Sequence, residues 1–278
     1  MKLSKTLALI VASALLVSSL HAQQTITIDA ESAKKSFSQT ISVTPMDKTV
    51  KITKNTVVIA PKAEGITYTI SGYFNGQIIN KTKNTVLKLK DAYIENTAGD
   101  AAIYGEAKTE ISTTNGTTNY IVASGKAKGD AKIGAIHGKK NLVLGGSGTL
   151  YVLGSVYHGV KADDVKIKGS GTLYLQGTQK GSGLNCDSLT VEKEKSFKAY
   201  FINSKNGVKA ENTISIASGE FFFYNNETAL KTDTKKDNPK EAHSITLSGG
   251  TFHNGANAEF HSTEKNAFSA NGALIVNE

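Results

Sequence analysis

The stretch YHGVKADDVKIKGSGTLYLQGTQKGSGLNCDSLTVEKEKSFKAYF, residues 157–201, restates itself after 24 residues. His158-Gly159-Val160-Lys161 aligns with Ser182-Gly183-Leu184-Asn185, and the strand-like alternation of 165–167 aligns with that of 189–191. A small residue followed by a large apolar one recurs at Ala102-Ile103, Ala135-Ile136, Gly159-Val160, Gly183-Leu184, Gly207-Val208, Ala229-Leu230 and Ala267-Phe268. Repeats of roughly 20–50 residues are typical of solenoids, propellers and other arrays.

The repeat contains short strands that alternate with period two, and it lacks a helical period. A propeller blade needs about 40 residues, and the leucine-rich-repeat signature is absent. The pattern therefore predicts an all-β fold, a parallel β-helix of roughly ten coils with about 24 residues each, stacked about 4.8 Å apart. Residues 49–60, 66–80 and 84–96 alternate in the same way and are interpreted as the first coils. Residues 29–38, DAESAKKSFS, predict a short capping helix or an irregular cover.

The chain begins with a basic start followed by the apolar run LALIVASALLVSSL. This pattern predicts a secretory signal peptide over residues 1–22 and a single β-helix domain over residues 23–278. No second apolar stretch reaches spanning length, so we expect no membrane span. The expected location is outside the cytoplasm, whether extracellular, periplasmic or on the cell surface.

Composition narrows the expected partner. The net charge is +8, and every basic residue is lysine, because the sequence contains no arginine. No nucleic-acid-binding motif is present, so a nucleic-acid partner is not expected. The single cysteine, Cys186, excludes an internal disulfide and falls in a column of small residues, which favours a core position over a reactive thiol. The expected partner is a polysaccharide of a plant cell wall or a cell envelope.

Equivalent positions of successive coils stack into columns, so the alignment predicts a surface. One outward column is predicted to hold Tyr151, Tyr174, Lys198 and Phe222, with His253 loosely aligned, and a second to hold Leu153, Gln176, Tyr200 and Tyr224. These rings predict a flat platform on which sugar rings stack. The alternative is that the rings only stabilise the sheet by cross-strand stacking, or lie beneath an insertion loop.

A third outward column is mostly basic: Tyr104, His137, Lys161, Asn185, Lys209 and Lys231. Lys161 and Lys209 are candidates to bind the carboxylates of uronate sugars. The alternative is a solvated lysine edge without a ligand.

Asp163, Asp164 and Asp187 gather at neighbouring positions of two coils. Carboxylates placed this close repel one another unless a cation intervenes, and calcium takes such oxygen ligands. They are therefore the candidate metal ligands, with calcium as the candidate cofactor. The alternative is a set of surface aspartates solvated among lysines.

The segments ITYTISGYFNGQIIN and NTVLKLKDAYIENTAGDAAIYGE, and the coils HGVKADDVKIKGSGTLYL and NGVKAENTISIASGEF, resemble the secreted bacterial carbohydrate-binding β-helix family. The resemblance covers roughly residues 66–252. It implies a right-handed parallel β-helix similar to some pectin and pectate lyases, binding of cellulose or acidic plant polysaccharide, and calcium held by aspartates. Asp164 and Asp187 stand closest to the family's aspartate position.

The leading hypothesis is an exported, non-catalytic protein that binds cellulose-like or uronate-containing polysaccharide. One alternative is a calcium-dependent polysaccharide lyase, in which Lys161 or Lys209 beside the aspartates serves as base for β-elimination. The other is a surface adhesin or scaffold that has no sugar site.

Overall fold

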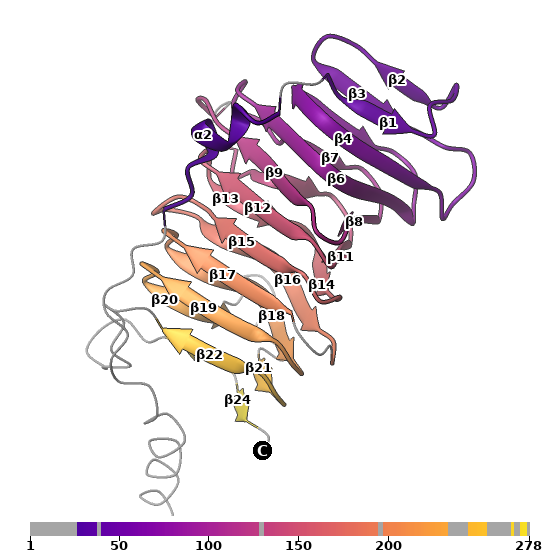
Figure 1. The fold of residues 1–278 in the computed structure, drawn as a ribbon. Helices are drawn as coiled ribbons and strands as arrows, with labels where there is room; N and C mark the ends of the chain where they lie inside the picture. Colours follow the sequence, from indigo (N-terminus) through magenta and orange to yellow (C-terminus); the bar gives the residue numbers. More distant parts are fainter. Residues whose placement is uncertain are drawn as a thin grey trace, which may run out of the picture.

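The computed structural model of the chain is a stack of β-strand coils, with one short helix among the residues that it describes (Figure 1). It describes residues 27–37, 40–127, 131–193, 197–232, 244–254, 268–269 and 273–276, and the expected signal peptide lies outside these ranges. The predicted parallel β-solenoid with about 24 residues per turn is confirmed. The predicted number of coils is wrong, because the structure has about seven turns and not ten.

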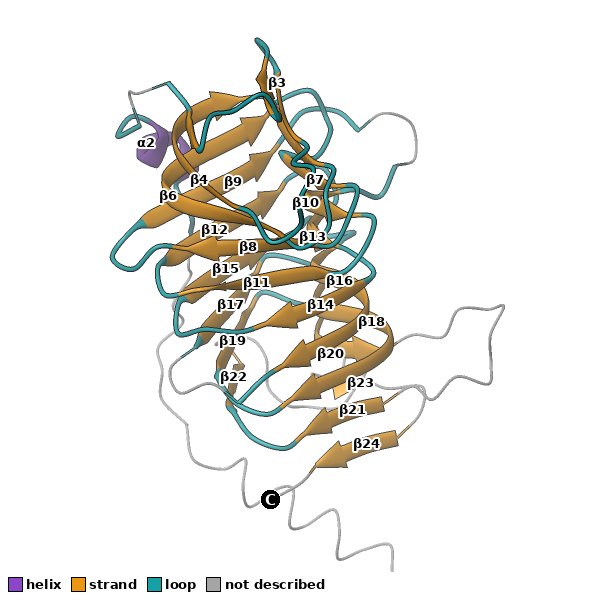
Figure 2. Cartoon of the chain, turned by 90° about the vertical axis from the view of Figure 1, so that its right-hand side faces the viewer, coloured by secondary structure: helices purple, strands orange, loops and turns teal. Residues whose placement is uncertain are grey.

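Three parallel stacks of strands run along the solenoid (Figure 2). We call the first the tyrosine sheet; it contains the second halves of β4 (Thr67–Asn75) and β6 (Thr85–Asn96), followed by β9 (Thr118–Ala123), β12 (Thr149–Gly154), β15 (Thr172–Gln176), β17 (Lys198–Ile202), β19 (Glu220–Tyr224) and β22 (Thr251–Asn254).

We call the second the lysine sheet; it contains β3 (Thr56–Ile59), β5 (Gln77–Asn80), β7 (Ile103–Gly105), β10 (Gly134–Gly138), β13 (His158–Lys161), the first halves of β16 (Ser182–Val191) and β18 (Asn206–Ile216), β20 (Thr228–Thr232) and β23 (Phe268–Ser269). The third sheet contains the first halves of β4 and β6, β8 (Thr109–Thr113), β11 (Leu142–Gly146), β14 (Asp164–Ile167), the second halves of β16 and β18, β21 (Ser244–Leu247) and β24 (Ala273–Val276).

The N-terminal end differs from the prediction. β2 (Val50–Ile52) and β3 form an antiparallel pair, and β1 (Ser42–Thr44) pairs antiparallel with β4. Residues 49–60 therefore do not form a complete coil, although they alternate like one, because alternation alone does not distinguish parallel from antiparallel pairing. The antiparallel strands lie beside the first parallel coils, where a bare sheet edge would otherwise invite aggregation.

The core lies inside the coils, between the three sheets. Strands such as β15 and β19 alternate between buried and half-buried residues, so leucine, isoleucine, valine and phenylalanine side chains of one face point inward. This period-two pattern is the direct consequence of the pleat. Each coil buries its inward side chains against those of the coils above and below it, so the coils stabilise one another.

Glycine fixes the turn between the third sheet and the tyrosine sheet. Gly146 and Gly169 occupy this turn in successive coils, and both have positive φ, +98° and +92°. A Cβ at Gly146 would lie 2.3 Å from the backbone of Thr113 in the preceding coil. The sequence GSG therefore recurs here because the turns stack too closely for a side chain.

The alignment of the lysine sheet is confirmed by its strand pairing, despite two insertions. The residues that lie opposite one another are Ile103, Ile136, Val160, Leu184, Val208, Leu230 and Phe268. Cys186 pairs with Ala210, and the cysteine is buried, as expected for a core position. Burial raises the pKa of the Cys186 thiol, which makes it unreactive at neutral pH.

Candidate functional site

A single column of aromatic rings runs along the outer face of the tyrosine sheet. Strand pairing places Tyr73, Tyr93, Tyr120, Tyr151, Tyr174, Tyr200, Phe222 and His253 directly opposite one another in successive coils. We call this set the aromatic column. Sequence analysis placed Tyr151, Tyr174, Phe222 and His253 in this column, but it assigned Tyr200 to a second column and missed the first three tyrosines, whose spacings do not follow the 24-residue repeat.

The rings of this column stack on one another. The ring centroids are 4.7 Å apart for Tyr120 and Tyr151, 4.4 Å for Tyr151 and Tyr174, and 4.5 Å for Tyr174 and Tyr200. The stack continues from Tyr200 to Phe222 and from Phe222 to His253, each at 4.4 Å, with planes within 9° of parallel.

This stacking changes the predicted recognition chemistry. A ring such as Tyr174 has a neighbouring ring against each of its two faces, so its face is not free to carry a sugar. What each tyrosine offers outward is its ring edge and its hydroxyl group, which both donates and accepts hydrogen bonds. The column therefore presents ring edges, with a hydroxyl group at each tyrosine from Tyr73 to Tyr200, and not the flat platform expected from the sequence.

Lys198 does not lie in this column, contrary to the prediction. Ala199, not Phe197, pairs with Leu173, so Tyr200 lies opposite Tyr174 and Lys198 lies opposite Thr172. The connection that precedes β17 is longer by two residues than the repeat suggests, and this shifts every side chain of the strand by two positions.

Lys198 is also paired. Its Nζ lies 2.8 Å from a carboxylate oxygen of Glu220, and the other oxygen of Glu220 lies 3.1 Å from Nε2 of His253. The hydrogen bond to Glu220 raises the pKa of Lys198, and the same bond lowers the pKa of Glu220. The positive charge beside the column is thus balanced by a carboxylate.

Tyr224 lies beside the aromatic column and not within a shared column with Tyr200. It pairs with Ile202, and its ring lies 6.5 Å from that of Tyr200 and 6.4 Å from that of Phe222. Its plane is nearly parallel to both. Tyr224 widens the aromatic surface at its C-terminal end.

The tyrosine hydroxyls stay neutral over a wide range of pH. Burial, with the neighbouring Tyr174 second, raises the pKa of Tyr151 to about 12, and burial is also the main cause that raises the pKa of Tyr200 and Tyr224. These groups are therefore uncharged hydrogen-bonding groups under physiological conditions.

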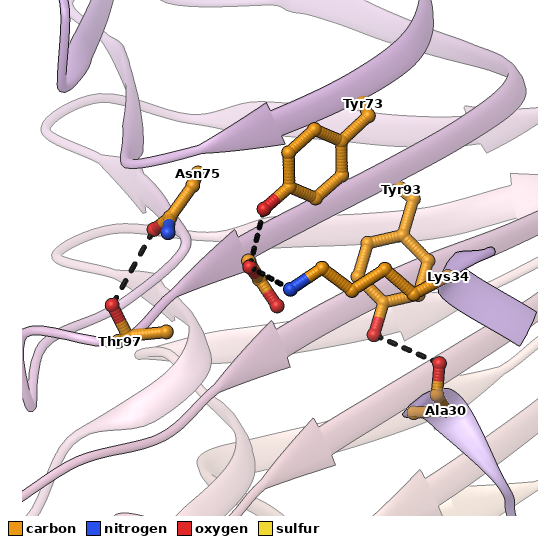
Figure 3. A network of polar contacts seen from close by, with 7 residues as sticks. Ala30, Lys34, Tyr73, Asn75, Tyr93 and Thr97 are labelled. Carbon is orange, nitrogen blue, oxygen red and sulfur yellow. Dashed lines mark hydrogen bonds and ion pairs between the residues drawn. The ribbon is translucent and has the colours of Figure 1, made fainter. Parts of the chain in front are cut away.

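The N-terminal end of the aromatic column is covered by α2 (Ala30–Lys34) and the residues beside it (Figure 3). Lys34 Nζ lies 2.6 Å from Glu95, and the Tyr93 hydroxyl donates to the carbonyl oxygen of Ala30. The short helix expected over residues 29–38 is confirmed, but it lies against the rings of the tyrosine sheet and not over the edge of the first coil.

The basic column on the lysine sheet has the predicted members. Tyr104, His137, Lys161, Asn185, Lys209 and Lys231 lie opposite one another in successive coils. Lys161 is half-buried and donates to the carbonyl oxygen of Lys132 at 2.9 Å. Burial is the main cause that lowers the pKa of Lys161, and the charge of Lys132 adds to it.

The three candidate metal ligands lie in adjacent coils, Asp163 and Asp164 in one and Asp187 in the next. Asp163 lies 4.0 Å from Lys140, its backbone oxygen accepts from the amide of Asp187, and Asp164 lies opposite Ser188. Within the part of the chain that the structure describes, no group of three or more His, Cys, Asp and Glu side chains is close enough to hold a metal ion. Calcium at these aspartates stays a prediction.

The fold and the ring column define a class of protein: a parallel β-solenoid with a column of aromatic rings on its outer face. A family model described as "Carbohydrate-binding domain-containing protein" matches residues 46–167 and again residues 160–278, so the chain belongs to this family. No curated protein matches the chain.

Among solved structures, the chain is similar to a polysaccharide lyase-like protein from C. thermocellum, solved as a gadolinium derivative. The two share 19% sequence identity over 84% of this chain and 92% of the other, with a TM-score of 0.68. This likeness shows the fold. No helix among the described residues is long and apolar enough to cross a membrane.

Proposed function

We propose that this protein is exported and binds the chains of a neutral, cellulose-like polysaccharide along the aromatic column, without cleaving them. The observation that carries the proposal is the uninterrupted stack of rings from Tyr151 to His253, which repeat every 4.4–4.5 Å and of which Tyr151, Tyr174 and Tyr200 carry hydroxyl groups. This spacing is close to the length of one sugar residue in an extended glycan, so one chain can lie along the column and meet one ring per sugar.

The charge around the column favours a neutral ligand. Thr149, Thr172 and Thr251 lie in the flanking column, and its one lysine, Lys198, is paired with Glu220 at 2.8 Å. A carboxylated sugar would have to compete with Glu220 for that lysine. Hydroxyl-rich sugars instead meet uncharged donors and acceptors, which matches a neutral glucan better than a polyuronate.

We expect each sugar to contribute a small binding free energy, and these contributions to add up over several sugars. A net hydrogen bond contributes only about 0.5–1.5 kcal/mol, because both groups give up bonds to water. Because the sheet is rigid, few side chains lose conformational freedom on binding. Less of the binding free energy is therefore lost to ordering the protein.

Retention of the purified protein on a panel of insoluble and soluble glycans tests the proposal. We expect retention on cellulose, with little change when salt is raised to about 1 M, where the Debye length is about 3 Å. The proposal fails if no neutral glycan of the panel retains the protein.

A second candidate function is binding or β-elimination of an acidic polysaccharide at the basic column. The lowered pKa of Lys161 favours it, because a half-buried lysine can act as a base more readily than a solvated one. The base would remove the proton at C5 of a uronate, the C4–C5 double bond would form as the glycosidic C4–O bond breaks, and the departing sugar oxygen would take up a proton from water, while a neighbouring cation neutralises the carboxylate. Formation of the unsaturated product from polygalacturonate, followed by its ultraviolet absorbance, would support this function, and its absence with calcium present would exclude it.

A further inference from the structure

Residues 28–37 occupy one end of the aromatic column. Phe37 lies with its ring centroid 5.5 Å from that of Tyr93 and 6.0 Å from that of Tyr120, in tilted and edge-on geometry. Ile28 and Ala30 pack in the same apolar cluster, which reaches Tyr151 and Leu153. The segment therefore lies against the first three rings of the column, since Lys34 lies over Tyr73 and, among the described residues, the ring contacts of Phe37 end at Tyr120.

The segment is anchored to the sheet by a buried charge. Lys34 reaches Glu95, whose side chain is only 4% exposed, and the Tyr73 hydroxyl donates to the same carboxylate oxygen (Figure 3). Lys34 also lies 5.3 Å from the centre of the Tyr73 ring. Breaking such a pair leaves a buried carboxylate without its counter-charge, which is costly, so the segment is held firmly against the rings.

The rings beneath the segment have the same chemistry as Tyr151, Tyr174 and Tyr200 beyond it. Tyr73, Tyr93 and Tyr120 continue the column in register with Tyr151, and all carry hydroxyl groups. Two of these hydroxyls are already used, by Glu95 and by the carbonyl oxygen of Ala30. Without the segment, the row of hydroxyl groups would extend by three rings.

We propose that residues 28–37 form the end wall of the polysaccharide site. This inference rests on the proposed function of the aromatic column. The wall confines the ligand to the rings from Tyr151 to His253, so the site holds a stretch of about five sugars, one per ring. A glycan that extends past Tyr151 has to turn away from the sheet or end there.

Binding of cello-oligosaccharides of increasing length, measured by calorimetry on the purified full chain, tests this limit. We expect affinity to rise about two- to tenfold with each added sugar, the value of one net hydrogen bond, until about the pentamer. The hexamer should then bind no more tightly than the pentamer. In Phe37→Ala the hexamer should gain a further two- to tenfold, because the Tyr120 edge becomes available.

Lys35→Ala is the matched control, because Lys35 belongs to the same segment but is exposed. It should keep the wild-type length dependence, whereas Lys34→Ala should behave like Phe37→Ala. Hydrogen exchange of residues 28–37 in the wild type gives a second measurement that needs no variant. Exchange there should stay slow when cellohexaose binds, since the wall remains in place.

The end wall is refuted if cellohexaose makes residues 28–37 exchange rapidly, because the glycan then displaces the segment. It is also refuted if the oligosaccharides bind but Phe37→Ala folds and leaves the length dependence unchanged. If no cello-oligosaccharide binds at all, the proposed function of the aromatic column fails, and the wall fails with it.

Discussion

The aromatic column and the basic column are built by the same coils, yet the two differ in how their neighbouring side chains interact. Along the tyrosine sheet, each ring from Tyr120 to His253 stacks on the next at 4.4–4.7 Å, so this part of the column stabilises itself. Along the lysine sheet, Lys161 lies near Lys132, and its pKa is lowered by burial and by that charge. A solenoid repeats the side chains that it carries, so it repeats ring stacking along one column and positive charge, at Lys161, Lys209 and Lys231, along the other.

The difference suggests two kinds of ligand. The aromatic column offers uncharged hydroxyl groups and a paired lysine, which suits a neutral glycan. The basic column would be relieved of repulsion by an anion, which suits a carboxylated glycan. Salt should distinguish binding at the two columns. It screens the charges of the basic column, and it barely affects the hydrogen bonds of the aromatic column.

The largest effect is expected from Tyr200→Ala. It removes a central hydroxyl and interrupts the stack between Tyr174 and Phe222. Affinity for cellohexaose should fall at least about tenfold. Each lost aromatic pair also costs about 0.5–1.5 kcal/mol, so calorimetry should show a Tm lower by a few degrees in a protein that still folds.

Tyr104→Ala is the control for this change. Tyr104 is a partly buried tyrosine of the lysine sheet, in another column of the same coils. It should keep wild-type affinity for cellohexaose. Equal losses in the two variants would mean that the effect of Tyr200→Ala is a general loss of structure and not the loss of a contact.

A smaller effect is expected from Lys161→Ala on acidic glycans. Retention on polygalacturonate at low salt should fall about three- to tenfold, because one charge of the basic column is lost. Affinity for cellohexaose should not change. If Lys161→Ala leaves retention on polygalacturonate unchanged and Tyr200→Ala abolishes it, both glycans bind to the aromatic column. The contrast between the two columns is then wrong.

A change in stability with pH is expected from the histidines of the lysine sheet. Burial lowers the pKa of His158 to about 3 and that of His137 to about 4, from an ordinary value of 6.5. As the pH falls below 6.5, the unfolded chain takes up these protons first, so the free energy of unfolding decreases. The decrease is on the order of 1 kcal/mol per pH unit for each histidine and continues toward pH 4.

His158→Asn should reduce this pH dependence. Nδ1 of His158 accepts from the backbone amide of Ser182, and Asn206 occupies a corresponding position two coils further on. Asparagine therefore fits the column and can accept the same hydrogen bond. Denaturant unfolding at pH 7 and pH 5 measures the change, and an identical pH dependence in the variant would show that His158 does not titrate in this range.

Calcium is expected to have the smallest effect. A site supplied by few carboxylates binds weakly, with dissociation constants of about 10⁻⁴–10⁻³ M. Millimolar calcium should raise the Tm slightly, and Asp163→Ala should remove that increase. If the Tm is the same with calcium and with chelator, Asp163, Asp164 and Asp187 are solvated surface residues that bind no calcium.

The sequence predicts the solenoid because its repeat is strict where coils have equal length. The pairing of Val160 with Leu184 and Val208 can be read directly from the 24-residue spacing. The alignment fails where a connection between strands changes length. Before β17 the connection has two extra residues, so Tyr200 and not Lys198 lies in the aromatic column.

The covered end of the aromatic column could not be predicted for a different reason. The contact between Lys34 and Glu95 joins residues 61 positions apart, and nothing in either segment indicates the other. Likewise, the sequence predicts rings on a surface but not their mutual stacking, so the exposed edges and hidden faces emerge only from the structure.

The central claim is that a neutral polysaccharide binds along the aromatic column, and one side-by-side measurement tests it most directly. Retention of the wild type and of Tyr200→Ala is compared on cellulose and on polygalacturonate, at low salt and at about 1 M salt. We expect cellulose to retain the wild type equally at both salt concentrations and no longer to retain Tyr200→Ala. Retention on polygalacturonate alone, lost at high salt and unaffected by Tyr200→Ala, would contradict it.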